Sequence, residues 1–283
     1  MATPQPYCGR FAPTPSGPLH FGSLVAAVAS YLDAQAHQGR WLVRIEDVDK
    51  PRAVPGAADV ILRQLEAHGL HWDGEVLLQS QRDAAYQAAL DELQRRQLSY
   101  YCTCTRKQVK ARGPYYTGYC RDKQRPPQGS AIRFRNDTPI CSFSDRWQGQ
   151  VTIEPAFASE DFVLYRRDQL YTYQLAVVVD DLEQGVTDLV RGADLLTPTA
   201  WQLTLWQQLS KRTPRLLHVP LALDAQGQKL SKQNHAPPLT EHQVAEQLQA
   251  AFRFLQLPEV VATDDPSVML QQATASWRTK YLS

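Results

Sequence analysis

The hydrophobic pattern of the first 45 residues predicts a strand, a loop, a helix and a second strand. An apolar run at 7–12 is followed by prolines and a Gly-Pro pair, which interrupt regular structure. From Leu19 apolar residues recur every three or four positions until about Gln38, so we expect a helix here that is capped by Gly39. Residues 41–45 are apolar on both faces, as in buried parallel strands. This order predicts a βαβ unit and an α/β fold of the Rossmann type with a doubly wound parallel sheet.

Farther along the chain, the same criteria predict more helices and buried strands. The tail from Thr240 to Ser283 is amphipathic and is expected to be helical. Two short apolar runs, 175–179 and 186–190, are expected to be buried strands like the one at 41–45, because each also ends in charged residues. The other expected elements are helices at 57–69, 83–97 and 199–209, strands at 130–135 and 216–221, and a hairpin made by 162–165 and 170–173.

The loop between the first strand and the first helix has the features of an anion site. A helix N-terminus offers backbone N–H groups and the positive end of the helix dipole, usually to phosphate. His20 and Ser23 fall in the first turn, where their side chains can reach the same anion. The second strand ends in an acidic segment that begins with Glu46, at the edge of the sheet where ligands bind. A polar turn before Pro51 is the alternative interpretation of that segment.

Composition narrows the class of protein. The chain has 283 residues, with Lys+Arg 30 against Asp+Glu 29, so its net charge of +1 excludes a polybasic nucleic-acid coat. Its apolar runs are far too short to cross a bilayer, and its N-terminus lacks a charged-then-apolar leader. We therefore expect a cytoplasmic enzyme that makes no membrane contact.

The regular pattern breaks from about residue 100 to 138, where three of the five cysteines lie. Cys102, Cys104 and Cys120 are spaced closely enough to hold zinc as thiolates. A fourth ligand would be a tyrosine, a water or a distant residue, since no histidine is nearby in sequence. The segment has little apolar area to bury, so a structural metal would stabilise it. Three ordinary reduced cysteines are the alternative.

Basic and aromatic residues alternate in the same segment. Such mixtures suit contacts with single-stranded or loop RNA, and a solvated basic loop is an equally good interpretation of these features. The residues concerned are Arg106, Lys107, Lys110, Arg112, Arg121, Lys123 and Arg125, with Tyr100, Tyr101, Tyr115, Tyr116 and Tyr119.

A second candidate phosphate site is a lysine-containing loop late in the chain. Lys229-Leu-Ser231-Lys232 follows a turn that contains Gly227. Two lysines on a loop can hold a triphosphate or pyrophosphate as point charges. Taken alone this motif is weak, because lysine-rich turns are usually only solvated.

Together, the two loops resemble the paired signatures of class I aminoacyl-tRNA synthetases. His20-Phe-Gly-Ser23 is similar to the HIGH motif and departs from it at the second and fourth positions; residues 229–233 are similar to KMSKS and depart at the second and fifth. The glutamyl branch is indicated by further blocks at 10–17, 44–49, 173–181 and 185–194. The resemblance covers roughly residues 7–235.

The small number of residues after the lysine loop narrows the choice of family within the glutamyl branch. About 50 residues remain there, too few for the anticodon-binding region of a glutamyl-tRNA synthetase. The cysteine-containing insertion resembles that of the truncated paralogues, the glutamyl-queuosine tRNA(Asp) synthetases, in which a tyrosine at the position of Tyr116 completes the zinc site. The expected domains are a first catalytic half at 1–99, an insertion at 100–174, a second catalytic half at 175–235 and a helical region at 236–283, with no anticodon-binding domain.

This resemblance implies an activity and a site. Glutamate would be activated with ATP and Mg²⁺ without tRNA, then esterified to the cyclopentenediol of queuosine at the wobble position of tRNA(Asp). One structural zinc per chain and a monomer are expected. The implied glutamate-binding residues are Arg10 and Arg191 for the carboxylates, Glu46 for the ammonium group, Tyr173, and the segment Phe11, Ala12, Pro13 and Thr14. The implied ATP-binding residues are His20, Gly22, Ser23, Lys229, Ser231 and Lys232, of which His20, Lys229 and Lys232 are catalytic.

Three rival functions remain open at this point. A short glutamyl-tRNA synthetase would need tRNA and would charge the usual 3′ end. An amide ligase or nucleotidyltransferase of the same superfamily would make a small molecule. A catalytically inactive paralogue would only bind RNA, but the presence of His20, Lys229 and Lys232 argues against that alternative.

Overall fold

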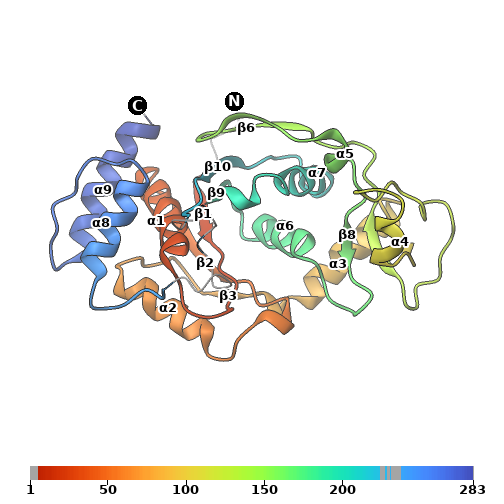
Figure 1. Cartoon of the computed structure of the whole chain (residues 1–283), viewed down its shortest axis with the longest axis horizontal. Coiled ribbons are helices and arrows are strands. Elements are labelled where there is room, and N and C mark those ends of the chain that lie inside the picture. The colour runs from red at the N-terminus through yellow and green to blue at the C-terminus, as the bar shows by residue number, and fades with distance from the viewer. Residues whose placement is uncertain (1–5, 224–226, 228–229, 231–236, 283) are drawn as a thin grey trace.

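The computed structural model describes residues 6–223, 227, 230 and 237–282, and its centre is a parallel β-sheet (Figure 1). Its strands are β1 Cys8–Phe11, β2 Arg40–Ile45, β3 Leu77–Leu78, β9 Asp188–Gly192 and β10 Arg215–Val219. β1 pairs with β2, β2 with β3, and β9 with β10, all in parallel. β9 begins beside β1, because the Thr187 N–H donates to the Cys8 carbonyl at 2.9 Å. The resulting order, β10-β9-β1-β2-β3, is a doubly wound sheet whose direction of winding changes between β1 and β9.

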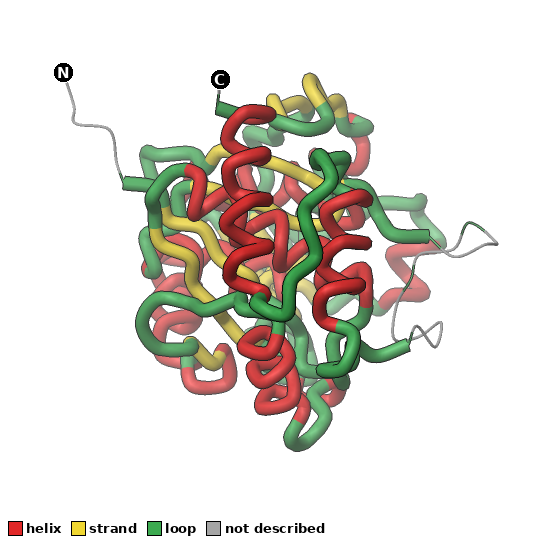
Figure 2. The backbone as a smooth tube through the Cα atoms, turned by 90° about the vertical axis from the view of Figure 1, so that its left-hand side faces the viewer, coloured by secondary structure: helices red, strands yellow, loops and turns green. Residues whose placement is uncertain are grey.

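Helices cover both faces of the sheet. Neighbouring residues of β9 point to opposite faces of the sheet. Val190 packs into the core beneath α1 (Phe21–Ala36), and Leu189 packs into the core beneath α6 (Tyr173–Glu183). Figure 2 shows two long helices standing in front of the strands on the first face. The helices on that face are α1 Phe21–Ala36, α2 Ala57–Ala67, α8 Val244–Phe254 and α9 Pro266–Tyr281; on the other they are α3 Asp83–Arg95, α6 Tyr173–Glu183 and α7 Thr199–Leu209.

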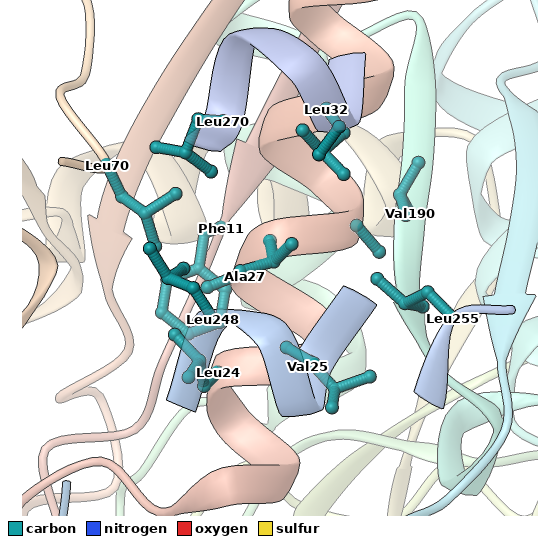
Figure 3. Packing of buried hydrophobic residues seen from close by; sticks show 14 of the residues in the cluster. Phe11, Leu24, Val25, Ala27, Leu32, Leu70, Val190, Leu248, Leu255 and Leu270 are labelled. Carbon is teal, nitrogen blue, oxygen red and sulfur yellow. The ribbon is translucent and has the colours of Figure 1, made fainter. Parts of the chain in front are cut away.

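Helix α1 is the centre of the larger core. Its Leu24 and Leu32 are fully buried, and the two C-terminal helices contribute Leu248 and Leu270 to the same cluster (Figure 3). Burying each such leucine contributes about 1.5–3 kcal/mol, so the packing of α8 and α9 fixes the position of α1. The N-terminus of α1, which belongs to the candidate site, is therefore held by the last part of the chain.

A buried carboxylate ties these elements together at the far end of α1. Asp33 accepts hydrogen bonds from Tyr7 Oη at 2.6 Å, Trp277 Nε1 at 2.9 Å and Arg146 Nη1 at 3.0 Å. Burial raises the pKa of this carboxyl, but the Arg146 guanidinium outweighs it and holds the pKa below its usual value. Four separate segments thus meet at one charge.

The insertion consists of two small antiparallel sheets. The sheet of β4 (Ser99–Cys102), β5 (Ala131–Phe134) and β8 (Val163–Tyr165) lies at the opposite end of the molecule from α8 and α9, whereas the hairpin of β6 (Ser142–Asp145) and β7 (Gly149–Thr152) runs back towards them (Figure 1). The hairpin β6–β7 reaches back to the parallel sheet, where the Arg146 N–H donates to the Leu216 carbonyl at 2.8 Å. The elements of the insertion are β4 Ser99–Cys102, α4 Arg106–Lys110, β5 Ala131–Phe134, β6 Ser142–Asp145, β7 Gly149–Thr152, α5 Pro155–Ala158 and β8 Val163–Tyr165. Short 3₁₀ turns elsewhere are η1 Lys50–Arg52, η2 Gln79–Gln81 and η3 Ala193–Leu195.

The pattern-based prediction for 175–179 was wrong. These residues form the middle of helix α6 and not a strand. A run of five apolar residues is too short for its periodicity to distinguish a buried strand from a helix buried on most sides. The predicted hairpin at 162–173 is only partly formed: β8 ends at Tyr165, which makes an isolated bridge to Tyr171 before α6 begins.

Gly39 plays a different part from the predicted one. The residue with positive φ after α1 is Gln38, at 54°, while the Gly39 N–H donates to the Ala34 carbonyl. A Cβ on Gly39 would lie 2.6 Å from the Tyr7 carbonyl oxygen. The glycine is needed for this close approach between the start of β2 and the chain before β1.

None of the helices in the described ranges is long and apolar enough to cross a membrane.

Candidate active site

The loop after β1 is fastened to the end of β2. The Glu46 N–H donates to the Pro13 carbonyl at 2.9 Å, and the Val54 N–H donates to the Pro15 carbonyl at 2.8 Å. The prolines restrict the loop further by fixing φ. As a result, the segment Phe11, Ala12, Pro13 and Thr14 lies directly beside Glu46, at the carboxyl ends of β1 and β2 where ligands of such sheets bind.

The first turn of α1 lies against the chain that flanks the lysine loop. His20 is the N-cap, and its Nε2 is 3.2 Å from Ser23 Oγ. A side chain at Gly22 would crowd its neighbours. Its Cβ would lie 3.1 Å from the His20 ring and 3.5 Å from the Leu230 carbonyl oxygen. The two predicted phosphate loops are thus neighbours through Leu230. The predicted Lys229, Ser231 and Lys232 lie outside the described residues.

A buried glutamine that no sequence motif indicates fixes this junction. Gln64 of α2 accepts the Leu19 N–H at 2.7 Å and donates to the Leu239 carbonyl at 3.0 Å. Leu19 precedes His20, and Leu239 follows the lysine loop and donates its own N–H to the Leu19 carbonyl at 2.9 Å. Both sides of the candidate phosphate site are therefore held to α2.

A network of buried charges lies at the carboxyl ends of the strands. Asp181 of α6 receives Arg10 Nε at 2.9 Å and Arg44 Nη1 at 2.7 Å, and Arg44 Nη2 is 3.3 Å from Glu46 Oε1. Asp181 and Arg44 belong to sequence blocks that indicated the glutamyl branch, but no role could be given to them from the sequence. Their part is to fix Arg10 and Glu46 by ion pairs that exclude water.

The carboxyl groups of this network differ in pKa. Burial raises the pKa of Glu46 to about 7, against the opposing effect of Arg44 and Arg10. Burial acts on Asp181 in the same direction, but Arg10 and Arg44 outweigh it and leave the pKa of Asp181 below its usual value. Glu46 is thus the carboxylate whose ionisation gains most from an additional positive charge.

Arg191, near the end of β9, differs from Arg10 because its partners are neutral. It donates from Nε to His218 Nε2 at 3.1 Å, and from Nη2 to Thr199 Oγ1 at 2.8 Å and Gln202 Oε1 at 2.6 Å. Its Nη1 is buried and has no hydrogen-bond partner among the residues that the structure describes. A buried guanidinium with an unsatisfied N–H group is costly, and an anionic ligand would relieve that cost.

Arg10, Glu46, Tyr173 and Arg191 form one electrostatic cluster. Burial raises the pKa of the Tyr173 hydroxyl, and the Glu46 carboxylate raises it further. Burial lowers the pKa of Arg191, and the guanidinium of Arg10 adds to that effect while Tyr173 opposes it. The structure therefore brings together the four charged or phenolic side chains that the resemblance assigned to glutamate.

The charges of this cluster do not balance among the described residues. Its arginines are Arg10, Arg44 and Arg191, and its carboxylates are Asp181 and Glu46. Counting these five groups alone, one positive charge is in excess when Glu46 is ionised. Two further buried carboxylates lie outside this count: Asp145 reaches Arg191 only through His218, and Asp180, which also acts on Arg44, is paired with Arg82. A ligand with one net negative charge, and with an ammonium group for Glu46, would complete the cluster.

The cysteines of the insertion converge as a metal site would require. The sulfur atoms of Cys102, Cys104 and Cys120 all lie within 4.8 Å of one another. The Tyr116 hydroxyl is 3.4 Å from Cys102 Sγ and accepts the Cys120 N–H at 2.8 Å. Burial opposes ionisation of Cys120, but hydrogen bonds from Tyr116 and Cys104 lower the pKa of its thiol to about 7. These residues could hold a metal ion.

Most of the tyrosines of the insertion make contacts within it, although only Tyr116 is buried. Tyr100 donates to Asp161, Tyr115 donates to Glu154 at 2.7 Å, and Tyr116 belongs to the cysteine cluster. Tyr119 is 42% exposed, and Arg112 and Lys123 both lie over its ring. The hydroxyls of Tyr100 and Tyr115 and the ring of Tyr119 thus each have a charged partner within the insertion.

Comparison with known proteins agrees with this geometry. Residues 8–257 match the family model of the catalytic domain of class I tRNA synthetases (E and Q). A glutamate tRNA ligase from Elizabethkingia meningosepticum, solved in complex with its amino acid, has a TM-score of 0.70 and 28% identity over 81% of this chain. The chain spans about half, 52%, of that protein. The fold and site thus define the class I tRNA synthetase catalytic domain.

More similar relatives identify the family within that class. A glutamyl-Q tRNA(Asp) synthetase from Idiomarina loihiensis is 58% identical over 97% of this chain and 98% of its own length. One from Yersinia pestis is 55% identical over 98% of this chain and 87% of its own. The chain belongs to the glutamyl-Q tRNA(Asp) synthetase family.

Proposed function

We propose that this protein activates glutamate with ATP, without tRNA, and transfers it to the cyclopentenediol of queuosine at the wobble position of tRNA(Asp). The observation that supports glutamate as the substrate is the buried Arg191, which shares a cluster with Arg10 and Glu46 and whose Nη1 has no partner in the described part of the chain. The family supports the acceptor, because its members are named for glutamylated queuosine of tRNA(Asp). The diol resembles the terminal ribose diol that ordinary synthetases charge, so one adenylate can serve either acceptor.

In this proposal the charged cluster binds and orients glutamate. Arg10 and Arg191 bind its carboxylates and Glu46 its ammonium group, while Tyr173 offers a hydroxyl. Ala12 and Thr14, in the loop after β1, line the amino-acid site together with their neighbours Phe11 and Pro13.

The α-carboxylate then attacks the α-phosphorus of ATP, and pyrophosphate leaves. His20 donates a hydrogen bond as negative charge develops on the phosphate, with Gly22 and Ser23 beside it at the helix N-terminus. The resemblance assigns the outer phosphates, with Mg²⁺, to Lys229, Ser231 and Lys232. The helix dipole contributes at most about 2 kcal/mol, so charged side chains supply most of the stabilisation of the transition state.

Two assays test this function. The first is glutamate-dependent ATP–pyrophosphate exchange, which we expect without any tRNA. The second compares glutamate transfer to tRNA(Asp) with and without queuosine, and we expect labelling only of the modified tRNA. Exchange that requires tRNA, or equal labelling of both tRNAs, would contradict the proposal and favour a short glutamyl-tRNA synthetase that charges the 3′ end.

We further propose that Cys102, Cys104, Cys120 and Tyr116 hold one zinc ion with a structural role. The convergence of the three sulfur atoms and the Tyr116 hydroxyl supports this, since four such ligands make a closed tetrahedral zinc site. We expect about one zinc per chain by mass spectrometry of the metal content, and loss of that zinc in Cys104→Ser and Cys120→Ser. Cys141→Ser, which alters a cysteine outside the cluster, should keep it. Full zinc content in the cluster variants would remove the proposed site.

The pKa of Glu46 predicts a pH dependence of glutamate binding. The carboxylate form is needed to bind ammonium, and the pKa of Glu46 is raised to about 7 by burial. Below that pH Glu46 becomes protonated, so the KM for glutamate in the exchange assay should rise, by up to about tenfold per pH unit. Glu46→Gln should have a high KM at every pH and no such rise. An unchanged acid limb in Glu46→Gln would assign the titration to another group.

A further inference from the structure

A chain of buried polar contacts extends from Arg191 into the insertion hairpin. Arg191 Nε donates to His218 Nε2 at 3.1 Å, and His218 Nδ1 is 2.7 Å from Asp145 Oδ2. His218 lies on β10 and Asp145 at the end of β6, and both side chains are wholly inaccessible to solvent, at 0% exposure. These hydrogen bonds therefore connect the candidate glutamate site to two residues that the proposed mechanism does not use.

The contacts determine the tautomer of His218. Arginine can only donate, so His218 Nε2 must carry a lone pair and the proton must be on Nδ1. Thr199 Oγ1 is also 3.1 Å from Nε2, but its own proton is directed to the Leu195 carbonyl at 2.6 Å. Nδ1–H then donates to Asp145. A protonated imidazole would have an acceptor for Nε2–H in Thr199 Oγ1 but would place N–H against N–H at Arg191, so the contact with Arg191 is the one that requires the neutral ring.

The surroundings keep the ring neutral. Burial lowers the pKa of His218, Asp145 opposes that effect, and the guanidinium groups of Arg191 and Arg10 support it. Asp145 is also held by backbone groups, because its Oδ1 accepts the N–H groups of Trp147 and Gln148 at 2.9 Å each and its Oδ2 accepts the backbone N–H of His218 at 3.1 Å. Asp145 thus caps the β6–β7 turn with one oxygen and orients the imidazole with the other.

We propose that Asp145 and His218 are positioning residues for Arg191, acting as a neutral acceptor relay that orients the guanidinium without neutralising it. This proposal rests on the proposed function. A carboxylate in place of the imidazole would pair with Arg191 as Asp181 pairs with Arg10, and would compete with the substrate carboxylate. The imidazole fixes Nε and leaves the positive charge, with the unpartnered Nη1, available to an anion.

The first test is the tautomer itself, by ¹⁵N-detected NMR of the histidine-labelled wild-type protein, with His218→Gln used to assign the signal. We expect Nδ1 protonated and Nε2 unprotonated. A doubly protonated ring, or a proton on Nε2 alone, would overturn the relay. This measurement needs neither substrate nor activity, so it stands apart from a failure of the proposed function, which would appear as wild-type protein without glutamate-dependent exchange.

The second test is Asp145→Asn, which keeps an oxygen for the turn but presents an amide N–H to His218 Nδ1. The histidine must then move its proton to Nε2, against Arg191. We expect the tautomer to invert and the KM for glutamate in ATP–pyrophosphate exchange to rise about ten- to a hundredfold, with the KM for ATP nearly unchanged. Asp168→Asn, which alters an exposed carboxylate paired with Arg166, should change neither.

The outcomes separate positioning from a merely structural role. Inversion of the tautomer with an unchanged KM for glutamate would overturn the proposal, as would equal rises of both KM values. His218→Gln, which retains an acceptor oxygen, should bind glutamate better than His218→Phe, which removes it; the reverse order would also contradict the relay. If Asp145→Asn fails to fold, the tautomer of the wild-type protein and the glutamate KM values of the two His218 variants still test the proposal.

Discussion

Replacing Arg191 with glutamine is expected to lower kcat/KM for glutamate in ATP–pyrophosphate exchange by about a hundred- to a thousandfold. Truncating one partner of a buried charge pair commonly costs 2–5 kcal/mol, and each 1.4 kcal/mol is about a factor of ten. The loss should appear mainly in the KM for glutamate, because Arg191 contacts the amino acid and not ATP in the proposed site. The substitution also removes a charge whose partners are all neutral, so it leaves no buried anion behind.

Two further variants make this result interpretable. Arg191→Lys keeps the charge but loses the planar fork, so it should recover only part of the activity. Arg95→Gln changes an exposed arginine in a surface ion pair with Glu92 and should be indistinguishable from wild type. If Arg191→Gln retained the wild-type KM for glutamate, Arg191 would have to be removed from the glutamate site.

Replacing Asp33 with alanine is expected to lower the free energy of unfolding by about 3–5 kcal/mol, the loss typical when one partner of a buried ion pair is removed. The guanidinium of Arg146 would lose its ion-pair partner, and the Tyr7 hydroxyl and the Trp277 indole N–H would both lose an acceptor. Urea denaturation followed by tryptophan fluorescence measures the change. Asp168→Ala, at an exposed ion pair, should cost less than about 1 kcal/mol.

The effect of Asp33 should depend on pH in a defined direction. Its pKa in the folded protein is below the usual value, so its contribution to stability is fully present above the unfolded pKa of about 3.9. That contribution is lost as the pH falls through the folded pKa. The difference in unfolding free energy between wild type and Asp33→Ala should therefore narrow in acid. A difference that stayed constant from pH 7 to pH 3 would show that the charge of Asp33 is not what stabilises the fold.

Local patterns in the sequence predicted much of the fold. The βαβ unit, the helix at 199–209 and the helical tail depend on apolar periods within one segment, which is information that a single stretch contains. The site residues depended less on such periods: Glu46 was selected from its place after a buried strand, whereas Arg10, Tyr173 and Arg191 were assigned through the resemblance to the glutamyl branch. The structure places all four in one electrostatic cluster.

What the sequence could not reveal depends on contacts between distant segments. His218 and Asp145 are 73 positions apart, and Trp277 meets Asp33 across 244 positions. Each of these residues looks ordinary in its own stretch, since a histidine in an apolar strand and an aspartate before a turn are common. Helix α6 was mistaken for a strand for another reason: the five apolar residues 175–179 follow one another without a polar residue, so they have no measurable period.

The excess positive charge of the buried cluster has a consequence for substrate selection. If glutamate fills the cluster as proposed, its one net negative charge balances the three arginines Arg10, Arg44 and Arg191 against Asp181 and Glu46. Glutamine has almost the same size and shape but no net charge, and would leave Arg191 with no anion in direct contact, because Asp145 is separated from it by the neutral His218. Its amide would also direct N–H donors at groups that can only donate. Charge, and not volume, would therefore reject glutamine, and a pocket wide enough for both amino acids would still need no editing step to tell them apart.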